Sequence, residues 1–143
     1  MKKLYTAVST AVGGRSGHVE SSDGKVSLDL SIPSEIGGPG GAGTNPEQLF
    51  ASGYAACFGS AVEYLAKQQK LPAGAVKVTA SVSIGPNDSG GFALETALDV
   101  TIPGLNQAAA EKLVNEAHQV CPYSNATRGN MPVTLTVTGS AAD

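Results

Sequence analysis

The sequence predicts an α+β fold: one domain over residues 1–143, in which a mainly antiparallel sheet packs on a long central helix. Three observations support this class. Several short segments alternate apolar and polar residues and are joined by glycine-rich turns, as antiparallel hairpins are. One fifteen-residue run, from Gln48 to Val62, contains no charged side chain, as a buried helix would. Repeated βαβ spacing is absent, so the expected order of elements is β-β-β-α-β-β-α-β.

The N-terminal third is expected to form two or three strands. The opening segment, residues 4–12, alternates as a strand does, so we interpret it as a strand and not as a secretory signal. Residues 18–32 are typical of a hairpin with Asp23 and Gly24 at its tip. The glycine-rich residues that follow are expected to form a long loop.

The long helix is expected to run from about Pro46 to Lys70. Asn45 suits the N-cap because its side chain can accept a backbone N–H, and proline is favoured at the first helical position. The residues between the regularly spaced apolar positions are also small or apolar. This helix is therefore expected to be covered on most sides.

The sequence of the second half of the chain predicts a hairpin, a shorter helix and a final strand. Asn106 can cap the shorter helix, and Pro122 is expected to end it, because proline disfavours helical geometry at the residue before it. The expected elements are strands at residues 76–84 and 92–102, a helix at 107–120 and a strand at 133–139.

The composition excludes several classes of function. The net charge of −3 gives a phosphate backbone nothing to be attracted to, so a nucleic-acid partner is not expected. No apolar run is long enough to span a membrane. Without export, the expected compartment is the reducing cytoplasm. There, a disulfide between the two cysteines would more often be catalytic or redox-sensing than structural.

Residues 38–43, GPGGAG, match the glycine pattern of dinucleotide-binding folds, and Glu63 lies twenty residues after the last glycine. That pattern binds nucleotides in a tight turn that leaves a buried parallel strand of a βαβ unit. Here residues 33–37 intervene and the chain next makes a hairpin, so we expect a flexible lid loop instead. A nucleotide-binding protein is the rival hypothesis, and it would make no use of the thiols.

The two cysteines occupy different surroundings in the sequence. Cys57 lies in the uncharged helix and looks buried, an environment that raises the pKa of a thiol and is typical of an inert cysteine. Cys121 directly precedes Pro122 and looks mobile. A reactive Cys57 would need a fixed cation, because it lies about three turns inside the helix, beyond the reach of the helix dipole.

Arg15 is the best candidate for that cation. It lies between glycines, which let the backbone approach closely, and its guanidinium could reach over a thiolate. Glu47 could hold Arg15 through a bidentate pair. Glu47 lies ten residues before Cys57, on roughly the same helix side but about 15 Å away along the axis. The ordinary alternatives, a solvated arginine and a glutamate that favours a helix N-terminus, stay open.

Three separated segments, GGRSGH, GGAGTNPEQLFASGYAACF and HQVCPYSNATRGN, resemble the organic hydroperoxide resistance proteins, a branch of the group that also holds the osmotically inducible thiol peroxidases. The resemblance covers essentially the whole chain. It implies that Cys57 attacks a peroxide and that Cys121 is the resolving cysteine, with Arg15 and Glu47 as the pair that activates Cys57. It also implies an intertwined homodimer whose active sites lie at the subunit interface.

The resemblance further implies no bound cofactor and reduction by a dithiol of the lipoyl type, such as dihydrolipoamide or a lipoylated protein. The expected substrates are organic hydroperoxides, alkyl or lipid, because apolar residues are expected around the reactive thiol. A redox-sensing or apolar-ligand-binding module without turnover is the alternative. The predicted substrate contacts are Phe50, Phe58, Ile36 and Met131. No direct role is assigned to His18, His118, Tyr123, Asn125 or Arg128.

Overall fold

In the computed structural model, which describes residues 1–141, the chain folds as two compact units. The first unit spans Met1–Leu49, and the second begins at Phe50, within helix α1 (Pro46–Gln68). Each unit contains its own three-stranded sheet. The expectation of a single domain over the whole chain stays a prediction.

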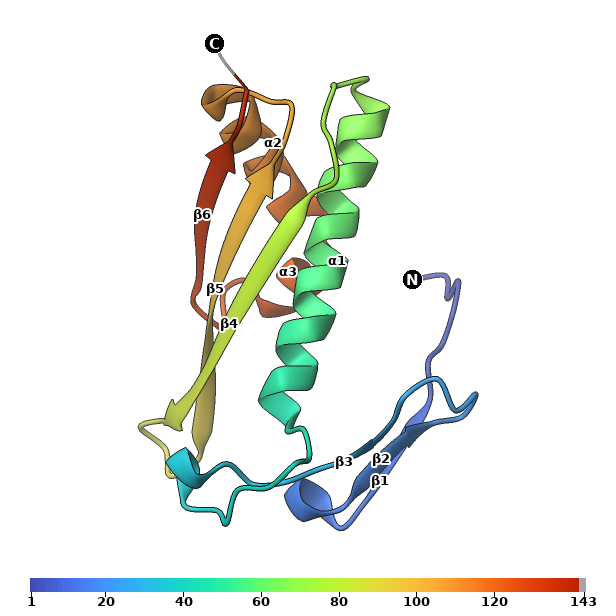
Figure 1. Cartoon of the computed structure of the whole chain (residues 1–143), viewed down its shortest axis with the longest axis vertical. Coiled ribbons are helices and arrows are strands. Elements are labelled where there is room, and N and C mark those ends of the chain that lie inside the picture. The colour runs from blue at the N-terminus through green and yellow to red at the C-terminus, as the bar shows by residue number, and fades with distance from the viewer. Residues whose placement is uncertain (142–143) are drawn as a thin grey trace. The chain divides into compact units, whose positions relative to one another are not determined.

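The first unit contains an antiparallel sheet in the order β1-β2-β3, drawn in shades of blue in Figure 1. Its strands are β1 (Ser9–Val12), β2 (His18–Ser21) and β3 (Ser27–Asp29). The predicted hairpin tip is confirmed, because Asp23 and Gly24 lie between β2 and β3 and the glycine has a φ of 75°. The opening strand begins at Ser9, later than predicted.

This first unit buries almost none of its own apolar surface. Among residues 1–49 only Leu30 is buried. A unit of this size without a core gains little stability of its own from the hydrophobic effect. Its exposed large apolar residues are Met1, Leu4, Tyr5, Val8, Val12, Val26, Leu28 and Ile36.

Helix α1 begins as predicted and ends slightly earlier. Asn45 caps it, since its Oδ1 accepts a hydrogen bond of 2.8 Å from the backbone N–H of Gln48. The helix ends at Gln68 because Lys70 adopts a left-handed φ of 56°, which helical backbone does not allow. Most positions of α1 are buried or half-buried, as expected, but one face of the helix is exposed. That face includes Ser52, Ala56, Ser60 and Tyr64.

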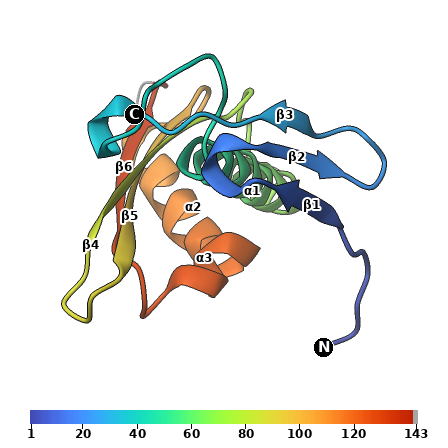
Figure 2. The same cartoon turned by 90° about the horizontal axis from the view of Figure 1, so that it is seen from below.

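The second unit packs its helices on one face of a sheet in the order β4-β5-β6, as Figures 1 and 2 show. β4 (Lys77–Pro86) and β5 (Phe92–Ile102) form the predicted hairpin. β6 (Val133–Gly139) runs parallel to β5, because α2 (Gln107–Val120) and α3 (Pro122–Thr127) form a crossover between them. Three of the four strand pairings are antiparallel, so the predicted mainly antiparallel α+β class is confirmed.

The core of the second unit lies between its sheet and its helices. Alternate residues of β5 face this core while the residues between them face away, as the alternating sequence predicts. Asn106 caps α2 as expected, through a bond of 2.9 Å from the N–H of Ala109. The largest buried side chains of this core are Tyr54, Phe58, Val62, Leu98, Val100, Ile102, Leu113 and Val114.

Helix α3 is an element that the sequence pattern did not indicate. Pro122 ends α2 as expected, but it also occupies the first position of α3, where proline is favoured because its missing N–H would have no helical partner. Cys121 is the single residue that joins the two helices. Its N–H donates to Ala117 of α2 at 2.8 Å, and its carbonyl accepts from Asn125 of α3 at 2.9 Å.

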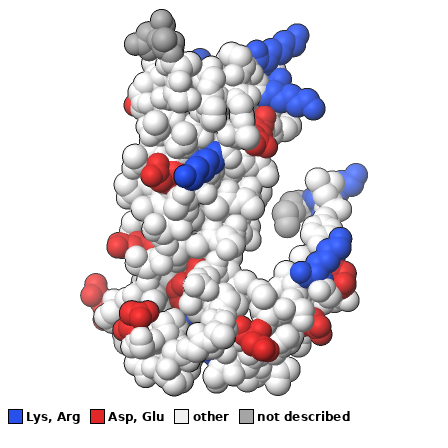
Figure 3. All heavy atoms as spheres, viewed as in Figure 1, with Lys and Arg blue, Asp and Glu red and all other residues white. Residues whose placement is uncertain are grey.

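The charged residues are spread over the surface. Nine basic and twelve acidic side chains give the net charge of −3. On the face drawn in Figure 3, they stand singly or in small groups between large uncharged areas. Within residues 1–141, no helix is both long enough and apolar enough to cross a membrane.

Candidate active site

The two cysteines are brought together in the second unit, although they lie 64 positions apart. Cys57 lies in the middle of α1 and Cys121 at the α2–α3 junction, with 3.6 Å between their Sγ atoms. Both are free thiols. A disulfide has an S–S length of about 2.05 Å, so an approach of about 1.5 Å would close the bond. Oxidation to a disulfide therefore requires no large rearrangement.

The exposure of the two thiols is opposite to the expectation. Cys57 is half-buried, whereas Cys121 is completely buried. The prediction that Cys57 is the buried thiol of the pair is therefore wrong, whereas the expected mobility of Cys121 stays a prediction. The uncharged run of α1 includes residues of the exposed face as well as of the buried face, so the lack of charge did not indicate burial. After Cys121 the chain forms α3 and does not leave the core.

Burial raises the pKa of the Cys57 thiol above its ordinary value. The backbone N–H of Tyr123, in the first turn of α3, donates a hydrogen bond to the Cys57 sulfur and lowers the pKa. The adjacent Cys121 thiol raises it further. Burial is the largest of these influences, so a Cys57 thiolate would need additional stabilisation by positive charge.

Arg15 and Glu47 form a bidentate ion pair within the first unit. The two terminal nitrogens of the guanidinium donate to the two carboxylate oxygens at 2.8 and 2.6 Å. The Glu47 side chain is 14% exposed and the Arg15 side chain 35% exposed. The pair raises the pKa of Arg15 and holds the pKa of Glu47 below its ordinary value, so both groups are charged at neutral pH.

Glycines make the turn that carries Arg15 possible. Arg15 lies in a short 3-10 helix, η1 (Gly14–Ser16). Gly13, before it, has a φ of 84°, in the region that favours glycine. After it, a Cβ on Gly17 would lie 1.8 Å from the carbonyl oxygen of Val12. The GGRSG segment therefore folds into a tight turn that other residues would not allow.

The thiol pair and the ion pair belong to different units. Arg15 and Glu47 lie in the first unit, and both cysteines lie in the second. Helix α1 carries Glu47 in its first turn and Cys57 near its middle. An effect of Arg15 on the Cys57 thiol therefore stays a prediction.

The four predicted substrate contacts have different surroundings. Phe50 is half-buried, and its ring lies edge-on to Tyr54 with 6.1 Å between the ring centroids. Met131 is half-buried against the core, and Ile36 is 43% exposed in the first unit. Phe58 is completely buried, so it packs the core and is not available to line an open pocket. Its expected contact with substrate stays a prediction.

A buried hydrogen-bond network adjoins the thiols, and no sequence pattern indicated it. Ser124 of α3 is completely buried, and its Oγ lies 2.8 Å from the Tyr54 hydroxyl of α1 and 2.8 Å from Nδ1 of His118 in α2. The Tyr54 hydroxyl also lies 3.5 Å from Oγ1 of Thr127. Burial and the charge of Arg128 both lower the pKa of His118, so its imidazole is neutral at pH 7.

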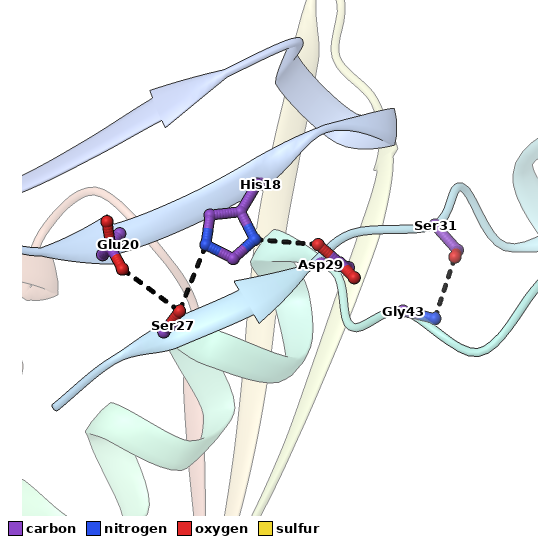
Figure 4. Close-up of polar contacts among 6 residues, drawn as sticks. All are labelled: His18, Glu20, Ser27, Asp29, Ser31 and Gly43. Atoms are coloured by element: carbon purple, nitrogen blue, oxygen red, sulfur yellow. Dashed lines mark hydrogen bonds and ion pairs between the residues drawn. The ribbon is translucent and has the colours of Figure 1, made fainter. Parts of the chain in front are cut away.

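A second polar cluster lies on β2 and β3 of the first unit, as Figure 4 shows. His18 Nδ1 lies 2.8 Å from Asp29, and Nε2 lies 3.2 Å from Ser27 Oγ, which also contacts Glu20 at 3.3 Å. These residue types occur in hydrolytic triads. Here, however, His18 and Asp29 are directly opposed across the strands, as are Glu20 and Ser27, and the cluster is largely exposed. We interpret it as cross-strand pairing that stabilises the hairpin.

The glycine-rich residues 38–43 are hydrogen-bonded to Ser31 and Ile32, which lie just after β3. Ser31 Oγ accepts the N–H of Gly43 at 2.9 Å, drawn in Figure 4, and the Ile32 carbonyl accepts the N–H of Gly40 at 2.9 Å. Strand β3, ahead of this segment, pairs antiparallel with β2. The segment therefore does not follow the parallel strand that a dinucleotide site requires.

A cavity of about 370 Å³ opens in the second unit, near the hairpin end of its sheet. Its walls are residues 83–86 and 93–95 and Pro132. Neither thiol nor any other predicted site residue lines it, so we do not assign it to the candidate site.

The chain is similar to proteins of one family. Residues 38–136 match the family described as OsmC-like protein. The chain is 55% identical over 137 residues to the organic hydroperoxide resistance protein of Xanthomonas axonopodis pv. citri, covering 95% of this chain and 96% of that protein. It is 47% identical over 133 residues to the organic hydroperoxide resistance protein OhrB of Bacillus subtilis, covering 92% and 96%.

Solved structures show the same similarity. The chain matches an organic hydroperoxide resistance protein from Legionella pneumophila with a TM-score of 0.92 and 55% identity, covering 96% of this chain and 99% of that one. For the protein from Elizabethkingia anophelis, with thiocyanate bound, the TM-score is 0.94 at 49% identity, covering 98% and 100%. The fold and the paired thiols thus define an OsmC-like α+β protein. The chain belongs to this family, in the branch of the organic hydroperoxide resistance proteins.

Proposed function

We propose that this chain is a cysteine-based peroxidase that reduces organic hydroperoxides to alcohols. The observation that carries the proposal is the 3.6 Å separation of two free thiols in a chain whose relatives are named organic hydroperoxide resistance proteins. Cys57 is the half-buried thiol, which a substrate can reach, so we assign it the attack on the peroxide. Cys121 is completely buried beside it, which suits a resolving cysteine.

The proposed reaction is a two-electron cycle. The Cys57 thiolate attacks an oxygen of ROOH, the O–O bond breaks, and the alkoxide takes up a proton and leaves as the alcohol, so that Cys57 becomes a sulfenic acid. The Cys121 thiolate attacks the sulfenic sulfur, an S–S bond forms and water leaves. A dithiol then reduces the disulfide by thiol–disulfide exchange and is itself oxidised to a disulfide.

We assign activation of the Cys57 thiol to Arg15, held in orientation by Glu47. Two observations support this. Burial raises the pKa of Cys57, so the thiolate requires a nearby cation. The bidentate bond to Glu47 keeps the Arg15 guanidinium charged and restricts its orientation, which reduces the cost of ordering it around a thiolate.

An intertwined homodimer is part of the proposal. The first unit buries a single residue and leaves an array of apolar side chains exposed. Within the described residues of the first unit, no strand pairs with the outer edge of β1, and the outer edge of β3 is bonded at Asp29, whose carbonyl accepts the N–H of Thr44. Unpaired edges next to exposed apolar surface are typical of regions that pair with another chain. A second copy of this chain would cover the apolar residues and pair with the outer edge of β1.

Sedimentation is expected to give a mass of about twice 14.3 kDa for the protein at micromolar concentration. Leu28→Asp would replace one of the exposed apolar side chains of the first unit by a charge and should shift the mass toward that of one chain. Lys25→Glu, at an exposed position beside the hairpin tip, is the control and should leave the mass unchanged. A parent protein that sediments as a single chain contradicts the dimer.

The proposed substrates are bulky alkyl or lipid hydroperoxides, and the proposed reductant is a lipoyl-type dithiol. Tyr123, whose backbone bonds the Cys57 sulfur, lies against Phe50 with 6.2 Å between the ring centroids. Both rings are partly exposed. Burial of an alkyl chain against apolar side chains of this kind is favourable, and hydrogen peroxide has no apolar group to bury. A cytoplasmic location stays a prediction from the sequence.

Stopped-flow turnover tests this proposal. With dihydrolipoamide as reductant, the protein should consume many equivalents of cumene hydroperoxide, and faster than hydrogen peroxide. A clear preference for hydrogen peroxide contradicts the proposed selectivity. Consumption of one equivalent without regeneration by any dithiol rejects the peroxidase and favours a redox-sensing module. Absence of thiol oxidation rejects both.

A further inference from the structure

We propose that Ser124 is a positioning residue that holds the resolving thiol against Cys57. The inference rests on the proposed peroxidase function, because it concerns the step in which Cys121 attacks the Cys57 sulfenic acid. Ser124 does not touch the reacting sulfurs in this assignment. It acts through Cys121, which lies three residues before it in the chain.

Ser124 joins three helices. It belongs to α3, and its Oγ lies 2.8 Å from the hydroxyl of Tyr54 in α1 and 2.8 Å from Nδ1 of His118 in α2. A serine hydroxyl has one proton, so it donates to one of these neighbours and accepts from the other. Ser124 and Tyr54 are both completely buried. Removing one partner of a buried hydrogen bond therefore loosens the contact more than the same change at the surface would.

This connection lies one helical turn from each thiol. Tyr54 precedes Cys57 by three residues on α1, and Ser124 follows Cys121 by three residues at the start of α3. Residues three apart on a helix are neighbours on one face. The Tyr54–Ser124 bond and the Cys57–Cys121 contact therefore bridge the same two elements in parallel. A shift of α3 away from α1 would lengthen both.

Cys121 moves together with the α2–α3 corner. Its backbone N–H is bonded to Ala117 and its carbonyl to Asn125, so it cannot shift independently of the two helices. The orientation of the corner against α1 therefore sets the distance between the sulfurs. The N–H of Tyr123, which bonds the Cys57 sulfur, is carried by the same corner.

His118 supports Ser124 from the α2 side as a neutral group. Burial and the charge of Arg128 lower the pKa of His118. A neutral imidazole can share a hydrogen bond with Ser124 without the cost of a buried charge. Arg128 also donates to the His118 carbonyl and, at 2.8 Å, to the Asn125 side chain, which fixes α3 to the end of α2.

Two substitutions remove the connection, and two matched substitutions leave it in place. Ser124→Ala and Tyr54→Phe each delete the Tyr54–Ser124 hydrogen bond, which joins α3 to α1. Ser124→Ala also removes the bond to His118 of α2, and Tyr54→Phe also removes the 3.5 Å contact with Thr127. Ser60→Ala and Tyr64→Phe delete the same groups at exposed positions of α1. Circular dichroism and thermal unfolding of the reduced proteins establish that each variant folds.

The first measurement is the fraction of Cys57–Cys121 disulfide at equilibrium with glutathione redox buffers, determined from intact mass. This fraction gives the effective concentration of one thiol toward the other, and it does not depend on any reaction with peroxide. We expect the effective concentration to fall about fivefold in Ser124→Ala and in Tyr54→Phe, the shift that one net hydrogen bond produces. The double variant should fall by clearly less than the two single changes combined, because the two changes share the Tyr54–Ser124 contact.

The second measurement is the fate of the Cys57 sulfenic acid under excess cumene hydroperoxide. Sulfenic acid that Cys121 does not resolve is oxidised further to sulfinic acid. The ratio of sulfinic product to disulfide should rise about fivefold in both variants, in proportion to the lost hydrogen bond. This ratio is set after the first attack, so it does not depend on how fast Cys57 first reacts. The exposed-position controls should match the parent.

A purely structural role for Ser124 gives a different result. The unfolding temperature would fall while the effective concentration and the product ratio stay at the parent values, and this outcome overturns the inference. If the parent does not react with hydroperoxides, the proposed function fails, but the glutathione equilibrium still tests the positioning. If Ser124→Ala does not fold, Tyr54→Phe decides through the same two measurements.

Discussion

Cys57→Ser is expected to abolish hydroperoxide consumption completely. A serine hydroxyl is scarcely ionised at neutral pH and cannot become a sulfenic acid, so both the attack and the later disulfide are lost. A peroxide assay should show no first turnover. Intact-mass spectra after treatment with cumene hydroperoxide should show no added oxygen at position 57 and no disulfide.

Cys121→Ser is the matched control, because it makes the same chemical change at the other sulfur of the pair. This variant should still consume one equivalent of hydroperoxide. Its Cys57 sulfenic acid then persists or is oxidised to the irreversible sulfinic acid, which the mass spectra detect as one or two added oxygens. If Cys121→Ser loses its first turnover while Cys57→Ser keeps it, the two roles are reversed.

The exposure of the thiols gives this division of roles a physical basis that the sequence patterns did not supply. A hydroperoxide must reach the attacking sulfur, whereas the resolving sulfur needs only to reach its neighbour. Cys57 is half-buried and Cys121 is completely buried, which is the order that these roles require. The sequence patterns pointed to the opposite order, because neither an uncharged run nor a following proline specifies which helix face is covered.

Local interactions made most of the fold predictable. Asn45 and Asn106 cap their helices in the structure because the cap is a contact between residues three apart, which the sequence displays directly. The strands could be predicted in the same way, because apolar and polar residues alternate with a period of two along them. The exposed face of α1 could not be predicted, because its composition matches that of the buried face and only tertiary packing separates them.

The site was predictable where it depends on residue chemistry, and less so where it depends on distant packing. Arginine and glutamate favour a bidentate pair, and Arg15 and Glu47 form one. The expectation that Cys57 and Cys121 act as a pair, although they lie 64 positions apart, came from the family resemblance and not from their spacing. The role of Ser124 depends on α3, which was not predicted. The available signal was Pro122, because proline is favoured at the first position of a helix. We interpreted Pro122 only as the residue that ends the preceding helix.

Arg15→Ala is expected to slow the attack of Cys57 on a hydroperoxide by at least about a hundredfold, the usual size of a lost preorganised charge. Burial already raises the pKa of Cys57, and loss of the cation should raise it further. Because only the thiolate attacks, the rate at neutral pH falls and the pH–rate profile moves to higher pH. Stopped-flow rates across a pH series, with thiolate absorbance measured in parallel, give both quantities.

Three further variants separate the charge from its orientation. Glu47→Ala should slow the reaction less than Arg15→Ala, because Glu47 orients the guanidinium and does not contact the peroxide. Arg15→Lys keeps the positive charge but loses the bidentate geometry, so its rate should lie between those of the parent and Arg15→Ala. Lys25→Ala removes an exposed cation from the same unit and should leave the rate unchanged. An Arg15→Ala protein whose Cys57 titrates and reacts as in the parent would show that the thiol is activated by another group.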